Sequence, residues 1–177
     1  MSKLILRRLV AFWLDYTIIA IYALLLFGIS KVMNLEKMTS TPISGQLLGF
    51  VSLTLPVFLY FFLTEKSESR ATIGKRVMNI SIRSKTENAE TRILLRNILK
   101  FLPWEIAHTG VHCIVFFSKS QNIVPFWIWI LLILPQLITI AYLFSIVISK
   151  GESSIYDSIS KTKVKINPSK TAIIWTH

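Results

Sequence analysis

The sequence predicts an all-α membrane protein, built as a bundle of four transmembrane helices with a cytoplasmic amphipathic helix and a small two-stranded β ribbon. The chain has 177 residues, a length typical of one domain, of which 53% are hydrophobic and only 16% charged. This composition is too apolar for a soluble domain of that size. The apolar residues gather in four runs, and two short segments alternate apolar and polar residues as half-buried strands do. We expect residues 1–166 to form one membrane domain and residues 167–177 a polar tail.

The first two apolar runs, residues 9–29 and 45–63, are each long enough to cross a bilayer. Asp15 lies about two turns inside the first run, where a carboxylate costs about 3 kcal/mol unless a partner or water reaches it. In the second run, Pro56 is expected to kink the helix and free a backbone carbonyl.

The polar region between the second and third runs predicts a strand over residues 78–83, and a matching alternation recurs over residues 161–166. Because a lone short strand is not stable, we expect the two segments to pair as a ribbon on the membrane face. Pairing would tie the tail back to the central loop.

Residues 89–102 predict an amphipathic helix, since Arg92, Arg96 and Lys100 recur every four residues among apolar side chains. Such a helix can lie at the level of the lipid headgroups with its basic stripe outward. Pro103 is expected to break or bend it as the chain enters the bilayer.

The third apolar run, residues 101–117, is short and polar inside, whereas the fourth, residues 124–148, is strongly apolar. With four crossings and a cytoplasmic N-terminus, 17 of the 20 lysines and arginines face the cytoplasm, and only Lys31, Lys37 and Lys119 lie outside. This asymmetry predicts a cell-membrane protein with both termini cytoplasmic. If the third run only re-entered the membrane, three spans would cross and the tail would lie outside.

The formal net charge of +11 is better explained by the membrane than by nucleic acid. The basic residues stand beside the apolar runs, where they set topology and attract anionic lipid headgroups. We therefore predict a lipid bilayer and no nucleic acid as the partner.

The candidate ion or proton site consists of ionisable side chains at membrane depth, namely Asp15, Glu105, His108 and His112. The last three share one helix face, and histidine titrates near neutral pH, which favours proton or monovalent-cation handling. A metal site of Glu105, His108 and His112 is the weaker alternative, because bundle metal sites take ligands from several helices. No cofactor is predicted. The structural alternative for Asp15 is that it only ties two helices together.

Five further residues are candidate charge partners at the cytoplasmic edge: Arg8, Lys75, Arg76, Arg96 and Asp157. Gly74 predicts a tight turn that places Lys75 and Arg76 at the bilayer surface, within reach of Asp15 or a lipid phosphate. Asp157 follows the last run at the level of Arg8, so an ion pair between them is expected. No set of residues typical of nucleophilic or acid–base catalysis occurs, so an enzyme is not favoured.

Four stretches of the chain resemble the RDD family of membrane proteins, which is named for one arginine and two aspartates. They are residues 7–15, 71–77, 96–103 and 156–162. The resemblance places the family's arginine on Arg8, its first aspartate on Asp15 and its second on Asp157. The chain departs from the family pattern at Ile73, where proline is usual, and at Tyr156, where histidine is frequent.

The resemblance implies a bacterial-type membrane protein involved in transport, including cation/proton exchange, although some relatives are accessory components of membrane assemblies. We therefore predict a transport-related protein with a buried Asp/Glu/His cluster. The alternative is a non-catalytic accessory or scaffold subunit of a membrane complex. Since four spans form a small bundle, a pathway would call for a homodimer or a partner membrane protein.

Overall fold

The computed structural model describes residues 2–34, 41–84, 87–119 and 123–167. The prediction that Lys37 faces outward lies outside the described residues, as does the polar tail beyond Asn167. Within the described chain the fold is mostly helical, and three helices are long and apolar enough to cross a membrane. They are α1 (Lys3–Val32), the continuous run Pro42–Lys66, and α6 (Phe126–Ile148).

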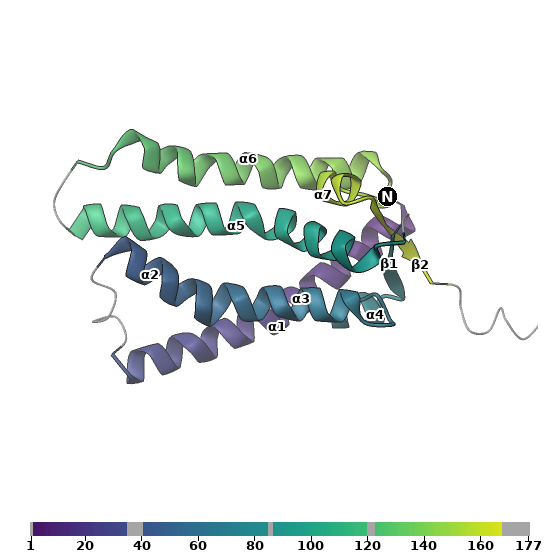
Figure 1. The fold of residues 1–177 in the computed structure, drawn as a ribbon, viewed down its shortest axis with the longest axis horizontal. Helices are drawn as coiled ribbons and strands as arrows, with labels where there is room; N and C mark the ends of the chain where they lie inside the picture. The colour runs from purple at the N-terminus through teal and green to yellow at the C-terminus, as the bar shows by residue number, and fades with distance from the viewer. Residues whose placement is uncertain (1, 35–40, 85–86, 120–122, 168–177) are drawn as a thin grey trace, which may run out of the picture.

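A fourth long helix, α5 (Ala89–Lys119), lies between α6 and the run Pro42–Lys66 (Figure 1). It joins the predicted amphipathic helix and the predicted third span into one element. Of the two outcomes expected at Pro103, a break or a bend, the break is wrong, because Pro103 lies inside α5. Its missing N–H leaves the carbonyl of Leu99 without a helical donor, and the hydroxyl of Tyr142 on α6 donates to that carbonyl at 3.1 Å.

The second span has three parts: α2 (Pro42–Gly49), a π-helical segment η2 (Phe50–Thr54) and α3 (Leu55–Lys66). The run changes direction along this stretch (Figure 1). Pro56 cannot donate to the carbonyl of Ser52, and the hydroxyl of Tyr22 on α1 does so at 2.6 Å. The prediction that Pro56 frees a backbone carbonyl is confirmed.

The predicted ribbon is confirmed as a two-stranded antiparallel sheet. Strand β1 (Ile80–Ser84) pairs with β2 (Thr162–Ile166) in a register that sets Ile82 opposite Val164. Ile80, Ile82 and Val164 are buried against Ala11 of α1. Alternation therefore places the apolar side chains on the face that covers the bundle.

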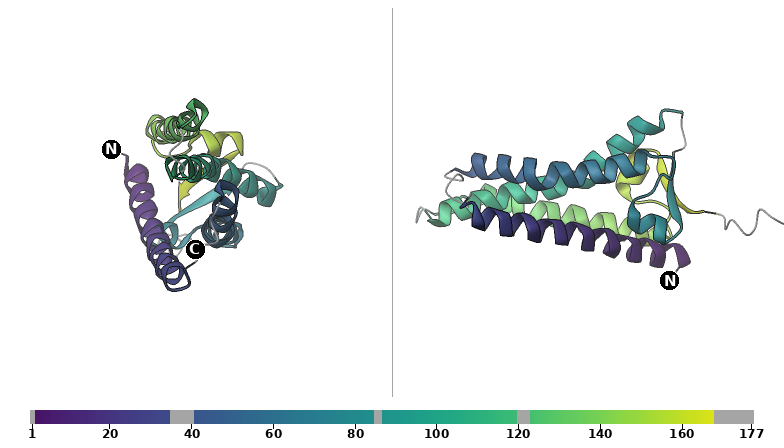
Figure 2. Two further views of the ribbon diagram at one scale, coloured as in Figure 1. Left: turned by 90° about the vertical axis from the view of Figure 1, so that its left-hand side faces the viewer. Right: turned by 90° about the horizontal axis from the view of Figure 1, so that it is seen from below.

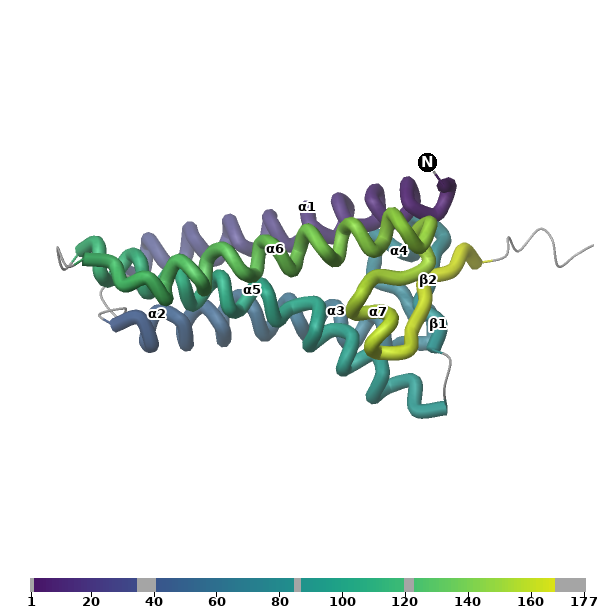
Figure 3. Tube along the Cα trace, turned by 90° about the horizontal axis from the view of Figure 1, so that it is seen from above, coloured from purple at the N-terminus to yellow at the C-terminus, as the bar shows by residue number. Residues whose placement is uncertain are grey.

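Two short helices complete the same end of the molecule: α4 (Ile73–Val77) and α7 (Ile155–Ile159). We call the end that carries the N-terminus, α4, α7 and the sheet the sheet end (Figure 3). Along its length α1 stands apart from α5 and α6, as the end-on view in Figure 2 shows. Its packing is concentrated at the sheet end, where it meets α4.

Candidate functional site

Asp15 is buried at the sheet end, where α1 meets α3 and α4. Its Oδ1 accepts hydrogen bonds from the hydroxyl of Tyr60 at 2.8 Å and from the backbone N–H of Gly74 at 2.9 Å. Its Oδ2 accepts one from the hydroxyl of Thr72 at 2.5 Å. Only 3% of Asp15 is exposed. These three donors are uncharged, so the carboxylate is stabilised without an ion pair.

The cations expected near Asp15 lie elsewhere. Lys75 bonds to Glu65, whereas the Arg76 guanidinium donates to the carbonyl of Ala71 and to the hydroxyl of Ser67. Gly74 itself packs against α1 so closely that a Cβ there would overlap the carbonyl oxygen of Ala11. Gly74 lies in the short helix α4 rather than in the predicted tight turn, and it brings backbone, rather than charge, to Asp15.

A buried ion cluster joins five segments of the chain at the sheet end. Its members come from α1, α3, α4, α5 and α7 respectively and are Arg8, Glu65, Lys75, Arg96 and Asp157. Arg96 links the two carboxylates, because its Nε lies 2.6 Å from Asp157 Oδ1 and its Nη1 lies 2.5 Å from Glu65 Oε2. Arg8 bonds to Asp157 at 3.0 Å, and Lys75 bonds to the other oxygen of Glu65. Arg96 is only 1% exposed, so the prediction of an outward basic stripe is wrong for this residue.

The ionisation of Asp157 and Lys75 follows from this cluster. Burial alone would raise the pKa of Asp157, but the neighbouring Arg96 and Arg8 outweigh it and lower the pKa to about 2. Burial lowers the pKa of Lys75, and the attraction of Glu65 offsets only part of that effect. Asp157 also caps α7 through the backbone N–H of Ser154 at 3.0 Å. The cluster therefore fixes α7 and the ends of α1, α3 and α5 together.

A second polar group lies farther along the bundle, where α5 faces α2 and α3. We call it the polar seam, and its members are Gln46, Glu105, His108 and His112. Glu105 Oε2 accepts a hydrogen bond from Gln46 Nε2 at 2.7 Å. The rings of His108 and His112 have centroids 4.7 Å apart.

Two glycines of α2 make room for the histidines of the polar seam. A Cβ at Gly45 would lie 2.6 Å from His112 Nδ1, and a Cβ at Gly49 would lie 2.5 Å from His108 Cε1. Larger side chains at either position would therefore push the imidazole rings out of the interface. The two glycines let α2 and α5 approach as closely as small residues do in membrane helix pairs.

Five buried side-chain atoms in the described residues have no hydrogen-bond partner, and four of the five belong to the polar seam. They are Gln46 Oε1, Glu105 Oε1, His108 Nδ1 and His112 Nε2. The fifth is Asn97 Oδ1, whose side-chain amide donates to Glu65 of the ion cluster at 3.0 Å. Leaving such an atom unpaired costs about 1–3 kcal/mol, and buried polar groups without a protein partner are typical of functional sites. A proton, a water molecule or a cation can satisfy the unpaired atoms of the polar seam.

The structure separates Asp15 from the other three residues of the candidate ion or proton site. Asp15 is bonded to Tyr60 and Glu105 to Gln46, and these two partners are 14 positions apart in one helical run, about 21 Å along its axis. In the part of the chain that the structure describes, no three His, Cys, Asp or Glu side chains converge as metal ligands do. A metal site of Glu105, His108 and His112 therefore has no geometric support.

Sequence reasoning missed several residues of both sites. The residues that were not predicted are Glu65, Gln46, Tyr60 and Thr72. The last three had no signal in the sequence beyond being polar near an apolar run. An acidic residue within the last turn of a transmembrane helix, as Glu65 is, was the one available sign.

Comparison with known proteins gives one family match. Residues 3–161 match the model of the family described as the RDD family. No curated protein and no solved structure matches the chain.

Proposed function

This chain belongs to the RDD family of membrane proteins, and we propose that it handles protons or monovalent cations through the polar seam. The observation that carries the proposal is that four of the five unpartnered buried side-chain atoms in the described residues lie on this one interface. Ionisable groups at membrane depth are costly and commonly mark ion or proton pathways. A histidine pair beside a carboxylate supplies groups that exchange protons near neutral pH.

We further propose that α5 is a fourth crossing and that both termini are cytoplasmic in the cell membrane. The sheet supports this, because β1 precedes α5 and β2 follows α6, yet the two strands pair. Paired strands lie on one side of the membrane, so an even number of crossings must separate them. α6 supplies one, and α5, with 31 residues and a length of about 46 Å, is long enough for the other.

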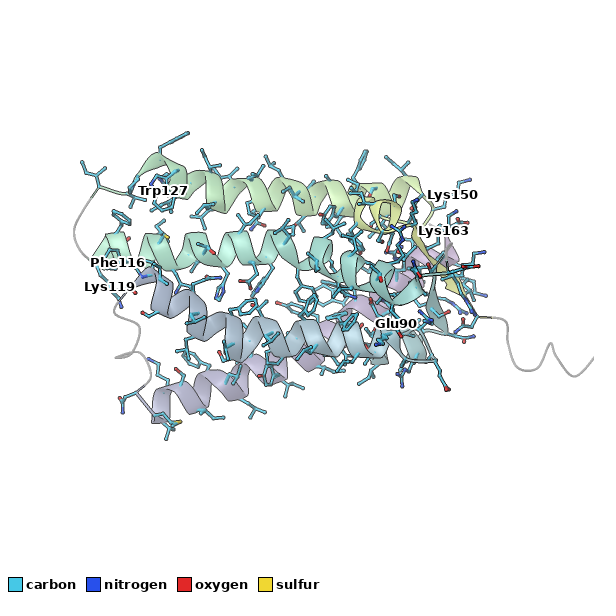
Figure 4. All side chains as sticks on the ribbon, in the orientation of Figure 1. Glu90, Phe116, Lys119, Trp127, Lys150 and Lys163 are labelled. Carbon is cyan, nitrogen blue, oxygen red and sulfur yellow. The ribbon has the colours of Figure 1, made fainter. Side chains whose placement is uncertain are left out.

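The distribution of charge agrees with this orientation. Lys150 and Lys163 lie at the sheet end, and Phe116 and Trp127 lie at the opposite end with Lys119 (Figure 4). The sheet end would then face the cytoplasm, as the preference for positive charge on that side requires.

In this proposal the two buried groups have different roles. Asp15 and the ion cluster hold the cytoplasmic ends of the helices together. The free oxygen of Glu105 and the free nitrogens of His108 and His112 accept the transported proton, or Glu105 and Gln46 together accept a cation through their free oxygens. The π-helical segment η2, which lies in the same span as Gln46, is a type of irregularity frequent at functional sites.

Purified protein reconstituted into vesicles tests the proposal. A pH-sensitive dye inside the vesicles reports proton flux when a sodium or potassium gradient is imposed. Wild-type vesicles should show flux above protein-free vesicles, and Glu105→Gln should lower it to background because the exchangeable carboxyl is lost. Asp15→Asn is the matched control, since it also removes a buried carboxylate but leaves the polar seam intact.

Unchanged flux in the Glu105→Gln variant would overturn the assignment to the polar seam. If Asp15→Asn abolishes the flux in protein that remains folded, the ion or proton site is at Asp15 instead of the polar seam.

The accessory or scaffold function remains the second candidate. It is favoured by the ion cluster, whose carboxylates have all their partners within the chain and which makes the sheet end a firmly held surface. A scaffold predicts no flux for wild-type protein and a membrane protein that copurifies with it from its own cells.

A further inference from the structure

Lys100 is a cation beside the ion cluster, and in the described residues it forms no ion pair with a carboxylate. It is half-buried on α5, one turn after Arg96. Its Nζ lies 3.2 Å from the centroid of the Phe61 ring and 5.5 Å from that of Phe101. Among the residues that the structure describes, none accepts a hydrogen bond from this ammonium, which differs in this respect from Lys75 and Arg96.

The neighbourhood of Lys100 has more positive than negative charge. The ion cluster itself contains three cations and two carboxylates. When Lys100 and Asp15 are added, four cations face three carboxylates, and Asp15 is bonded only to uncharged donors. An unbalanced charge in a partly buried site is unfavourable unless a counter-charge reaches it.

The surroundings of Lys100 suit a ligand that approaches from the membrane surface. Phe58, Phe61 and Phe101 form a wall of edge-to-face rings, with centroids 5.6 to 5.7 Å apart. The first turns of α5 diverge from the other helices at the sheet end (Figure 2). A lysine in a membrane helix can direct its ammonium toward the headgroups while its stem stays in apolar surroundings.

We propose that Lys100 anchors a binding site for a phosphate group, which an anionic lipid headgroup or free phosphate can supply. The ammonium donates to the phosphate oxygens, and the positive field of Arg96 and Lys75 adds to the attraction. The phosphate supplies the negative charge that the sheet end lacks. Basic pockets between membrane helices are known to hold lipid headgroups in this way.

Thermal unfolding of the purified protein in mild detergent tests the site. Phosphatidylglycerol is added in one arm, phosphatidylcholine in a second and inorganic phosphate in a third. Phosphatidylglycerol should raise the unfolding midpoint by several degrees relative to phosphatidylcholine, because a ligand that binds only the folded state stabilises it. Lys100→Met should abolish this rise, and Lys100→Arg should keep it.

Lys163→Met is the matched control, since Lys163 is a cation of the same end that pairs with Glu152 at 2.8 Å. It should keep the full response to phosphatidylglycerol. An equal rise with inorganic phosphate would identify free phosphate as the ligand. The proposal is overturned if wild-type protein responds to neither, or if Lys100→Met responds as wild type does. Native mass spectrometry, which counts bound phosphatidylglycerol per chain, decides the case should Lys100→Met prove too unstable for the thermal comparison.

Discussion

At the scale of single residues, Asp15 and Gly74 depend on each other. Gly74 brings its N–H to the Asp15 carboxylate because no side chain separates α4 from α1. The sequence predicted a tight turn at Gly74, where the structure has the short helix α4, and it predicted that Asp15 needs a partner. It did not identify neutral donors as that partner, because their proximity depends on how α1, α3 and α4 pack.

Gly74→Ala is expected to destabilise the protein by about 1–3 kcal/mol, a typical cost of overpacking. The new Cβ would meet the backbone of Ala11, which cannot move without shifting α1. Thermal unfolding in detergent measures the effect. Gly28→Ala is the control, because a Cβ at Gly28 meets nothing within 4 Å. Equal midpoints for the two variants would show that the contact with Ala11 is not tight.

Asp157 gives the protein a defined sensitivity to acid. Its pKa in the folded protein is about 2, below the ordinary value of 3.8, so its ion pairs contribute stability above about pH 4. This contribution, about 2 kcal/mol, is lost as the pH falls toward 2. Unfolding midpoints of wild type and Asp157→Asn should differ most at neutral pH and converge in acid. A difference that stays constant with pH would contradict the assignment.

At the scale of elements, two prolines and two tyrosines form matching pairs across helix interfaces. Pro56 and Pro103 each leave one carbonyl without a helical donor, and Tyr22 and Tyr142 each supply a hydroxyl from the neighbouring helix. Inside a membrane no water is available to donate a hydrogen bond to an unsatisfied backbone carbonyl. The tyrosine hydroxyls therefore offset the hydrogen bonds that the prolines remove. They also hold α1 against η2 and α6 against α5.

Tyr22→Phe and Tyr142→Phe should each lower the free energy of unfolding by about 1 kcal/mol, the usual net value of one hydrogen bond. Tyr16→Phe serves as the control, because Tyr16 is half exposed and stacks on Phe12. The comparison uses thermal midpoints under one set of detergent conditions. If only Tyr16→Phe lowers the thermal midpoint, the two tyrosine hydroxyls do not stabilise the carbonyls that the prolines leave free.

The elements that sequence predicted well are those determined by local pattern. Alternation gave both strands and their pairing, and apolar length gave α1, the second span and α6. The separate amphipathic helix over residues 89–102 was not found, because its pattern continues past Pro103 into one helix whose freed carbonyl is satisfied from α6. A local pattern contains no information about a hydroxyl 43 positions away.

At the scale of the whole molecule, the buried polar residues form two groups. One is the ion cluster with Asp15 at the sheet end, and the other is the polar seam farther along the bundle. Arg8, Arg96 and Asp157 could be named from the sequence because they stand at membrane edges, where charge is expected. The ion pair between Arg96 and Glu65 could not be predicted, because these residues are 31 positions apart and meet only when α3 and α5 pack.

Four crossings predict opposite exposure for the two ends of the bundle. Lys31→Cys and Lys163→Cys, each in a Cys113→Ala background, are to be labelled with a membrane-impermeant maleimide in intact cells. Lys31→Cys should react from outside, and Lys163→Cys should react only after the membrane is opened. External labelling of Lys163→Cys would mean that α5 does not cross.

The ion cluster also has a consequence for the order in which the protein is made. Arg8 leaves the ribosome well before its carboxylate partner, Asp157, which lies 149 positions later in the chain. The helices between them are therefore made before α7 is present to join them. A nascent chain released before that point would leave Arg8 and Arg96 without Asp157.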